Sequence, residues 1–142
     1  MKIRGWILII SFLSIIFLLN SCKNTEEPSL LISIKIIELY DYNADSTYDK
    51  ALLSVSVINP SGKDITLEKY VSECFDKDGN LIFKQTILDP YPYKLGGLEK
   101  YIWNNISINL TYDGKKVKKY KFTLYYLDNN KNYSTYAEKT LN

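Results

Sequence analysis

Few side chains in this chain have types and spacings suited to chemistry. Cys22 and Cys74 are the two thiols, and no histidine occurs among the 142 residues. Without imidazole the chain lacks the commonest general base, and a zinc site would need other ligands. The acidic residues lie mainly on expected turns and do not form an obvious pair across a cleft. We therefore expect a protein that is not an enzyme, with no catalytic residues, no metal site and no cofactor.

Cys22 stands where an N-terminal apolar run ends. Lys2 and Arg4 precede the run over residues 7–19, and the polar residues 23–27 follow at once. A basic start followed by a short apolar core is typical of an export signal. A membrane-spanning helix needs about 20 apolar residues, so this run is too short for one. The pattern predicts a signal peptide over residues 1–21.

The last four residues of this segment, Leu19-Asn20-Ser21-Cys22, resemble the lipobox of bacterial lipoproteins. Asn20 departs from the small or aliphatic residue usual at its position. The resemblance implies cleavage before Cys22, a diacylglycerol thioether on its sulfur and acylation of its new amino group. Two or more acyl chains anchor a protein stably in a bilayer. The alternative is an ordinary secretory signal in which Cys22 follows by chance.

The composition of the mature chain differs from that of the whole sequence. Loss of Lys2 and Arg4 lowers the 18 basic residues to 16, which equals the 16 acidic residues. A formally neutral chain gives no electrostatic attraction to nucleic acid. Residues 22–29 are polar and predict a flexible tether behind the lipidated cysteine. Their charges resemble signals that send lipoproteins to the cell surface, so we expect an envelope location in the outer membrane, with the surface-exposed and the periplasmic face as the two alternatives.

Residues 30–142 are expected to form one all-β domain. Apolar residues recur at every second position in seven segments, and Asp-Gly turn signals separate some of them. A slip in the alternation suggests a bulge near Asn104 and Asn105. Residues 89–97, rich in proline and glycine, are expected to be a loop that crosses between sheets, without regular structure. The segments are 30–40, 51–58, 65–75, 81–88, 99–112, 117–127 and 133–141.

Several motifs occur in a fixed order along these segments: Val55 to Asn59, Gly62, Ile65, Cys74 to Leu81, Leu95, Gly97 to Glu99 and Lys119 to Phe122. This order resembles the FxLYD-type immunoglobulin-like domains of bacterial envelope proteins. The resemblance covers about residues 51–127 and implies an antiparallel immunoglobulin-like β-sandwich of about seven strands. Such motifs describe turns and strand ends, so they carry no information on activity.

An acidic loop between the first two segments is the one candidate for a cation. Asp41, Asn43, Asp45 and Asp49 occupy positions one, three, five and nine, as at the start of a calcium loop. The glycine at position six and the glutamate at position twelve are missing, and strands flank the loop instead of helices. Asp and Asn are also the usual residues of solvated turns. We expect an ordinary loop here.

Cys74 and a lysine-rich stretch also receive structural interpretations. Cys74 lies in an apolar strand pattern and is expected to be a small buried hydrophobe, not a reactive thiol. The lysines are expected to line a solvated hairpin and to keep an exposed strand from pairing with other chains. They are Lys115, Lys116, Lys118, Lys119 and Lys121.

Tyrosines are the candidates for ligand contact, because a tyrosine ring is apolar with a polar tip. Tyr91, Tyr93 and Tyr101 cluster near the crossing loop, where they could hold a sugar or a peptide. A second group surrounds the last hairpin, although most tyrosines are expected to pack within the sheets. This group is Tyr112, Tyr120, Tyr125 and Tyr126.

The function expected from these features is that of an interaction module. It would be held on the membrane through Cys22 and would contact an envelope protein through a strand edge or a loop end. The alternative is a glycan-binding surface lipoprotein that uses the region of Tyr91 and Tyr93. An enzyme is a third possibility.

Overall fold

A computed structural model describes residues 30–45, 47–88 and 92–141 of the protein. These residues form ten strands and no helix, and every strand pairing is antiparallel. The strands are β1 (Leu31–Tyr40), β2 (Lys50–Ile58), β3 (Ile65–Phe75), β4 (Leu81–Ile87), β5 (Tyr93–Leu95), β6 (Lys100–Asn109), β7 (Thr111–Tyr112), β8 (Lys115–Lys116), β9 (Lys119–Asp128) and β10 (Lys131–Thr140). The all-β prediction is confirmed, and each of the seven expected segments overlaps one of the seven long strands. The segment expected at 99–112 is not one strand, because it divides at Leu110 into β6 and β7, which belong to different sheets.

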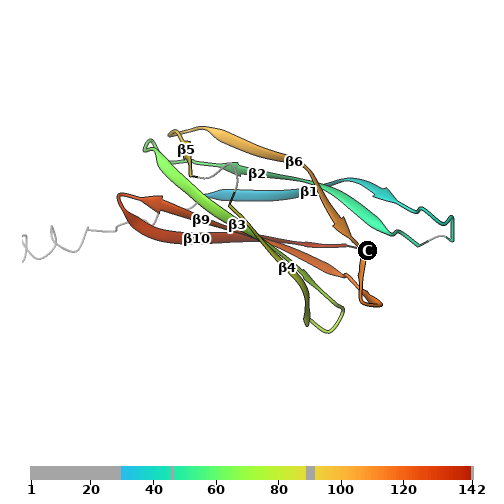
Figure 1. The fold of residues 1–142 in the computed structure, drawn as a ribbon. Helices are drawn as coiled ribbons and strands as arrows, with labels where there is room; N and C mark the ends of the chain where they lie inside the picture. The colour runs from blue at the N-terminus through green and yellow to red at the C-terminus, as the bar shows by residue number, and fades with distance from the viewer. Residues whose placement is uncertain (1–29, 46, 89–91, 142) are drawn as a thin grey trace, which may run out of the picture.

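The first sheet has the order β1-β2-β6 (Figure 1). The expected alternation of apolar and polar residues is present along β2. Ala51, Leu53, Val55 and Val57 are buried, whereas the serines between them are half-buried. On that other face, the Ser56 and Ser33 hydroxyls of paired strands lie 2.8 Å apart. One face of β2 therefore supplies the core and the other carries polar cross-strand contacts.

The second sheet has the order β10-β9-β3-β4, and β5 also pairs with β3. Residues 93–95 correct our expectation that 89–97 hold no regular structure. Leu95 lies opposite Ile65 in this pairing, and both side chains are buried. The short strand β5 forms here because the long strand β3 offers it a partner. The chain passes from this sheet to the first one after β5. Residues 89–91 lie outside the described residues.

Two-residue turns connect two of the hairpins. Asp113 and Gly114 have φ angles of 48° and 75° between β7 and β8, and Asn129 and Asn130 have 48° and 62° between β9 and β10. Positive φ at both central residues is the type I′ geometry, which Asn, Asp and Gly adopt most readily. The expected hairpin at 76–80 is also present, where the Asp76 carboxylate accepts backbone hydrogen bonds from Asp78 and Asn80.

The expected bulge lies in β6. Val55 pairs with Trp103 and Leu53 pairs with Ile106, so the two residues 104 and 105 stand opposite the single residue Ser54. Asn105 has a φ of 61°, which asparagine tolerates better than most residues. The bulge restores the inward phase, and both Trp103 and Ile108 are buried.

The hydrophobic core lies between the two larger sheets (Figure 1). Trp103 of β6 meets Phe122 of β9 across it, with ring centroids 5.2 Å apart. On one side of the core, the edge strands β1 and β10 lie next to each other. On the opposite side the edge strands are β6 and β4, and there the sheets are separated by a cavity.

Candidate functional site

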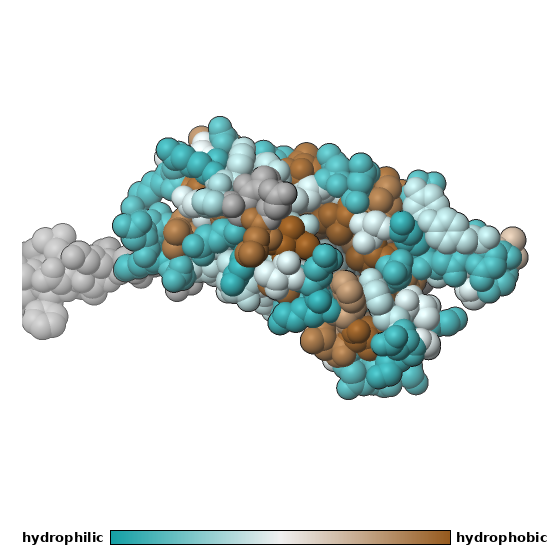
Figure 2. Space-filling view, in the orientation of Figure 1, coloured by the Kyte–Doolittle hydropathy of each residue, from teal (hydrophilic) through white to brown (hydrophobic). Residues whose placement is uncertain are grey.

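A cavity of about 300 Å³ opens between β6 of the first sheet and β3 and β4 of the second. We call it the β4–β6 cleft. Figure 2 shows apolar residues at the surface between these strands. Its lining residues are Tyr70, Ser72, Phe83, Gln85, Ile87, Trp103, Asn104, Asn105, Ile106, Ser107, Ile108 and Tyr112.

Aromatic rings form the apolar part of the cleft. Tyr70 stacks on Phe122 with centroids 4.8 Å apart and meets the edge of Trp103 at 5.7 Å. Phe83 of β4 stacks on Tyr112 at 4.5 Å, with ring planes only 10° apart. Packed rings of this kind give a rigid apolar surface that loses little conformational entropy on binding.

The cleft carries no formal charge among its lining residues. Burial raises the pKa of the Tyr70 hydroxyl and of the Tyr112 hydroxyl, so both stay protonated at neutral pH. The exposed polar residues of the lining carry amides and a hydroxyl: Gln85 lies on the β4 rim, and Asn104, Asn105 and Ser107 lie on the β6 rim. Such a surface suits a neutral or apolar ligand group better than a phosphate or a carboxylate.

Both rims of the cleft are sheet edges. Within the described residues, β6 pairs with β2 and no other strand, and β4 pairs with β3 and no other strand. The outer side of each therefore presents main-chain groups that an added strand can pair with. The cleft thus combines an apolar cavity with two edges that can accept an extended chain.

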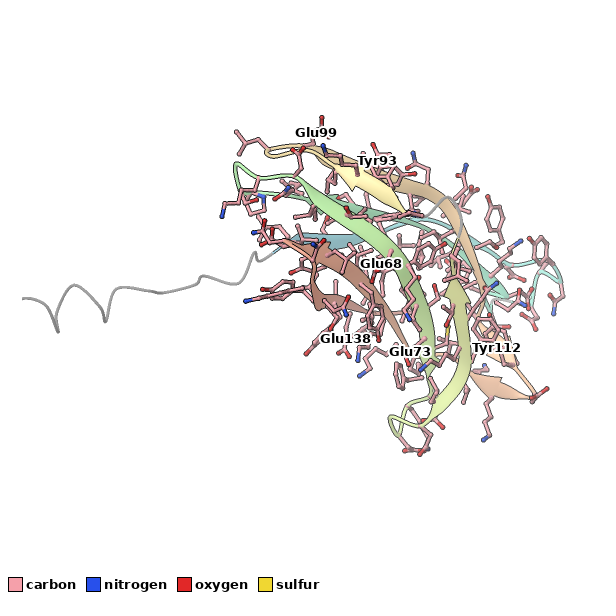
Figure 3. All side chains as sticks on the ribbon, turned by 60° about the vertical axis from the view of Figure 1, so that its left-hand side comes forward. Glu68, Glu73, Tyr93, Glu99, Tyr112 and Glu138 are labelled. Carbon is pink, nitrogen blue, oxygen red and sulfur yellow. The ribbon has the colours of Figure 1, made fainter. Side chains whose placement is uncertain are left out.

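Two of the three tyrosines expected to bind a ligand come together. Tyr93 and Tyr101 are half-buried, with ring centroids 4.8 Å apart and planes tilted by 54°, and Tyr101 continues to Trp103 at 4.7 Å. They form a short aromatic row beside the cleft rather than part of its lining. Figure 3 shows Tyr93 near one end of the domain and Tyr112 towards the other. Tyr91 lies outside the described residues.

The second expected group of tyrosines is not a cluster. Tyr120 is fully buried and its hydroxyl lies 2.8 Å from that of Ser72, while Tyr126 is buried and stacks on Tyr133. Tyr125 points to the other face of the sheet, beneath the Lys69 ammonium. Successive side chains of a strand point to opposite faces, which separates residues that are neighbours in sequence. Tyr112 is the member that reaches the cleft.

The lysine-rich stretch has two roles. Lys115, Lys116 and Lys118 are exposed around the β7–β8 hairpin, as expected. Lys119 and Lys121 lie on β9, which is an inner strand between β10 and β3, so the expectation of edge protection is wrong for them. They instead balance acidic residues of the neighbouring strands. Lys119 pairs with Glu138 at 3.4 Å, and Lys121 lies 4.0 Å from Glu73.

The acidic loop is held by its own backbone. The Asp49 carboxylate accepts a hydrogen bond from the Tyr42 amide, and the Asp45 carboxylate accepts from the amide and hydroxyl of Thr47. These bonds lower the pKa of Asp45. Across residues 30–45, 47–88 and 92–141, no three His, Cys, Asp or Glu side chains converge in a way that could hold a metal ion. The carboxylates of Asp45 and Asp49 therefore accept hydrogen bonds from within the loop.

Cys74 is a buried thiol, as expected. Its side chain is fully covered by the core, and burial raises its pKa to about 11. A thiol that stays protonated and inaccessible is a poor nucleophile. Cys22, the predicted site of lipid attachment, lies outside the described residues, as do the predicted signal peptide and tether. No helix long and apolar enough to cross a membrane occurs in the part of the chain that the structure describes.

The fold defines an all-β protein of antiparallel sheets, and comparison with known proteins agrees with that. No protein family and no curated protein sequence matches the chain. Among solved structures it is similar to a Bordetella pertussis protein assigned as ApaA, with a TM-score of 0.59 and 13% identity over 80% of this chain and 92% of that one. The structural-genomics target SoR45 gives a TM-score of 0.47 and 11% identity over 80% and 86%. At such identities the likeness concerns the fold only.

The residues that sequence reasoning missed lie in the middle of strands. Tyr70, Phe83 and Gln85 come from β3 and β4, and they face the cleft because those strands lie opposite β6. The alternation of Phe83, Gln85 and Ile87 predicts one common face. It does not tell whether another sheet covers that face.

Proposed function

We propose that the protein is a non-enzymatic, lipid-anchored lipoprotein of the bacterial envelope that binds a protein partner in the β4–β6 cleft. The observation that carries this proposal is the pair of sheet edges flanking an uncharged, aromatic-lined cavity. The proposed fold is an immunoglobulin-like β-sandwich, supported by the two larger sheets that share one core and by the seven long strands.

An extended peptide fits these features best. Its backbone would pair with the outer edge of β6 or β4, and its side chains would alternate toward and away from the cavity, roughly 7 Å apart on each face. The size of the cavity suits one large side chain, and the aromatic lining favours an aliphatic or aromatic one. Main-chain pairing supplies affinity, and the anchor residue supplies selectivity.

The anchor is supported by the Leu19 to Cys22 segment and is tested first. We expect radiolabelled palmitate to be incorporated into the protein in bacterial cells and to be lost in Cys22→Ala. Ser21→Ala, which keeps a small residue before the cysteine, serves as the control and should keep the label. Labelling that persists in Cys22→Ala would refute the anchor.

Peptide binding is tested with a phage-displayed library of random 12-residue peptides on the purified mature lipoprotein. We expect selected peptides to share an apolar anchor with polar residues at alternate positions. Gln85→Arg places a long side chain on the exposed rim of β4, on the face that Gln85 shares with Phe83 and Ile87, and should weaken binding at least tenfold. Ser134→Arg is the matched control, because Ser134 is exposed on β10, the edge strand beside β1.

Two results would refute the hypothesis that the cleft binds a peptide. One is an absence of enriched peptides, and the other is equal binding by the two arginine variants.

A second candidate is glycan binding, which the Tyr93–Tyr101 pair favours. Half-buried rings next to each other can stack on the apolar face of a sugar, and the neighbouring amides can bind its hydroxyl groups. A glycan array of the mature lipoprotein tests it. Signals that disappear in Tyr93→Ala but persist in Gln85→Arg would favour glycan binding, whereas no signal above background would exclude it.

A further inference from the structure

Several loops gather at the end of the domain where the described chain begins. Leu31 pairs with Ile58, and Ile65 pairs with Leu95, so the start of β1 lies at the same end as the loops after β2 and β5. In Figure 1 this is the left-hand end, where the turn between β9 and β10 also lies. Figure 3 shows Glu99 at this end and Tyr112 towards the opposite one.

Two of these loops are joined through Asn59, which is fully buried. Its side-chain amide donates hydrogen bonds to the carbonyl oxygens of Lys63 and Gly96, at 2.7 and 3.1 Å. The Leu98 amide donates in turn to the Asn59 carbonyl at 3.0 Å. We call residues 59–64 and 94–100 the Leu98 platform. These bonds make it a rigid surface rather than a pair of independent loops.

The contact between the two loops requires glycine. A Cβ atom on Gly97 would lie 2.6 Å from the Gly62 carbonyl carbon, which no side chain can accommodate without movement of the backbone. The Gly97 amide is also within 3.3 Å of the Asp64 carboxylate, which pairs with Lys94 at 2.7 Å. The platform is therefore closely packed up to the residue that precedes Leu98.

Leu98 is a leucine where neither the backbone nor the core favours one. Its φ is 64°, a conformation that costs a non-glycine residue roughly 1–2 kcal/mol. Its side chain is 75% exposed, the largest value among the exposed large hydrophobic residues of the described chain. A glycine would fit this backbone without strain. The leucine therefore offers an apolar contact to something outside the domain.

The length of the chain before β1 points to the identity of that contact. Residues 22–29 connect the proposed lipidated Cys22 to Leu30 at this end, and eight residues span at most about 29 Å. The anchored membrane surface is thus within reach of the platform. Leu31, which is 57% exposed, adds a second apolar side chain here. The platform's three lysines outnumber its two acidic residues, which favours the anionic surface of a bacterial membrane.

We propose that the Leu98 platform rests on the membrane, with Leu98 inserted into the lipid interface. The domain then stands on this end, and its hairpins at 76–80 and 113–114 point away from the bilayer. The proposal rests on the lipid anchor at Cys22 but not on any peptide bound in the cleft. Insertion of one leucine is a weak contact in isolation, but the tether confines it to the surface and makes it effectively intramolecular.

The experiment places the mature lipoprotein in vesicles of phosphatidylethanolamine and phosphatidylglycerol in which a fraction of the acyl chains is brominated. Bromine quenches only tryptophan that enters the lipid. Leu98→Trp is compared with Leu81→Trp, since Leu81 is a 49% exposed leucine at the 76–80 hairpin. The wild-type protein reports the background of the buried Trp103. We expect at least twofold quenching for Leu98→Trp and none for Leu81→Trp.

Vesicle flotation distinguishes a failure of the lipid anchor from a failure of the contact between the platform and the membrane. Protein that floats with the vesicles but shows equal, unquenched fluorescence in both variants overturns the platform proposal and leaves the anchor intact. Protein that does not float overturns the anchor and the platform proposal together. Quenching of both variants also overturns it, because the domain then has no preferred end on the membrane. Equal urea midpoints for the two variants confirm that each is folded.

Discussion

Asn59→Ala offers the sharpest test of how this domain is held together. The side chain of Asn59 makes four hydrogen bonds inside the protein: the amide donates to the carbonyls of Lys63 and Gly96, and its oxygen accepts from the amide and hydroxyl of Ser61, at 3.1 and 2.7 Å. Alanine removes all four and leaves a small gap. The substitution changes no charge, so its effect reports the hydrogen bonds and little else.

The expected magnitude follows from what happens to the partners of Asn59. A protein hydrogen bond contributes ~1 kcal/mol net, so four set an upper value of about 4 kcal/mol. Lys63 is exposed, and Ser61 and Gly96 are half-buried, so water can replace part of what is lost. We therefore expect the free energy of unfolding to fall by about 2–3 kcal/mol. Asn132→Ala, at an exposed position of β10, should change it by less than about 0.5 kcal/mol.

The assay is urea unfolding followed by Trp103 fluorescence. With a slope of roughly 1–3 kcal/mol per molar urea, a loss of about 2–3 kcal/mol should move the midpoint of Asn59→Ala down by about 0.7–3 M. The Leu98 platform should also lose rigidity, seen as faster hydrogen exchange of the Leu98 amide. A midpoint equal to that of Asn132→Ala would show that the two loops do not depend on Asn59 and would refute this account of the platform.

Three further predictions concern the Leu98 platform and the core. Gly97→Ala should lower the unfolding free energy by about 1–3 kcal/mol because its Cβ would meet the Gly62 backbone, whereas Gly62→Ala, with open space around it, should be nearly neutral in the same urea assay. Cys74 should not react with a thiol reagent in the folded protein and should react fully in urea, because the thiol is buried and its pKa is raised to about 11. Burial also raises the pKa of the Tyr120 hydroxyl, so the stability it contributes is complete below about pH 10, the pKa of an unfolded tyrosine, and falls at higher pH. Tyr120→Phe should therefore reduce the alkaline loss of stability, by up to about 1.4 kcal/mol per pH unit.

Each of these has an outcome that contradicts it. Equal midpoints for the two glycine variants would mean that the loops part without cost. Rapid labelling of Cys74 in the native state would place the thiol at the surface. A stability curve of Tyr120→Phe that runs parallel to that of the wild type above pH 10 would show that this hydroxyl does not titrate with unfolding.

Local features of the fold were predictable because they depend on neighbouring residues. The alternation of Leu53, Val55 and Val57 predicts a strand with one buried face, and Asp113-Gly114 predicts a tight turn. The phase slip around Asn104 predicts a bulge even without knowledge of the partner strand. In each case the backbone geometry is set by the residues themselves and by the period of two.

Features that depend on pairing were not predictable in this way. The three residues of β5 form a strand because β3 extends far enough to pair with them. Nothing in the sequence of residues 93–95 indicates this strand. The interior position of β9 likewise follows from the sheet order, and so Lys119 and Lys121 face acidic partners instead of protecting an edge.

The same distinction between local sequence and long-range pairing applies to the candidate site. The sequence by itself determined that catalytic groups are scarce, that residues 22–142 are formally neutral, that Cys22 follows an export-type segment, and that the rest alternates as strands. Only the tertiary structure decided where a ligand could bind. The β4–β6 cleft exists because two sheet edges diverge on one side of the core while β1 and β10 meet on the other. The Leu98 platform exists because Asn59 bonds two loops that are more than thirty residues apart in sequence. Such long-range contacts are set by the packing of whole sheets, and a local pattern of residue types carries no record of them.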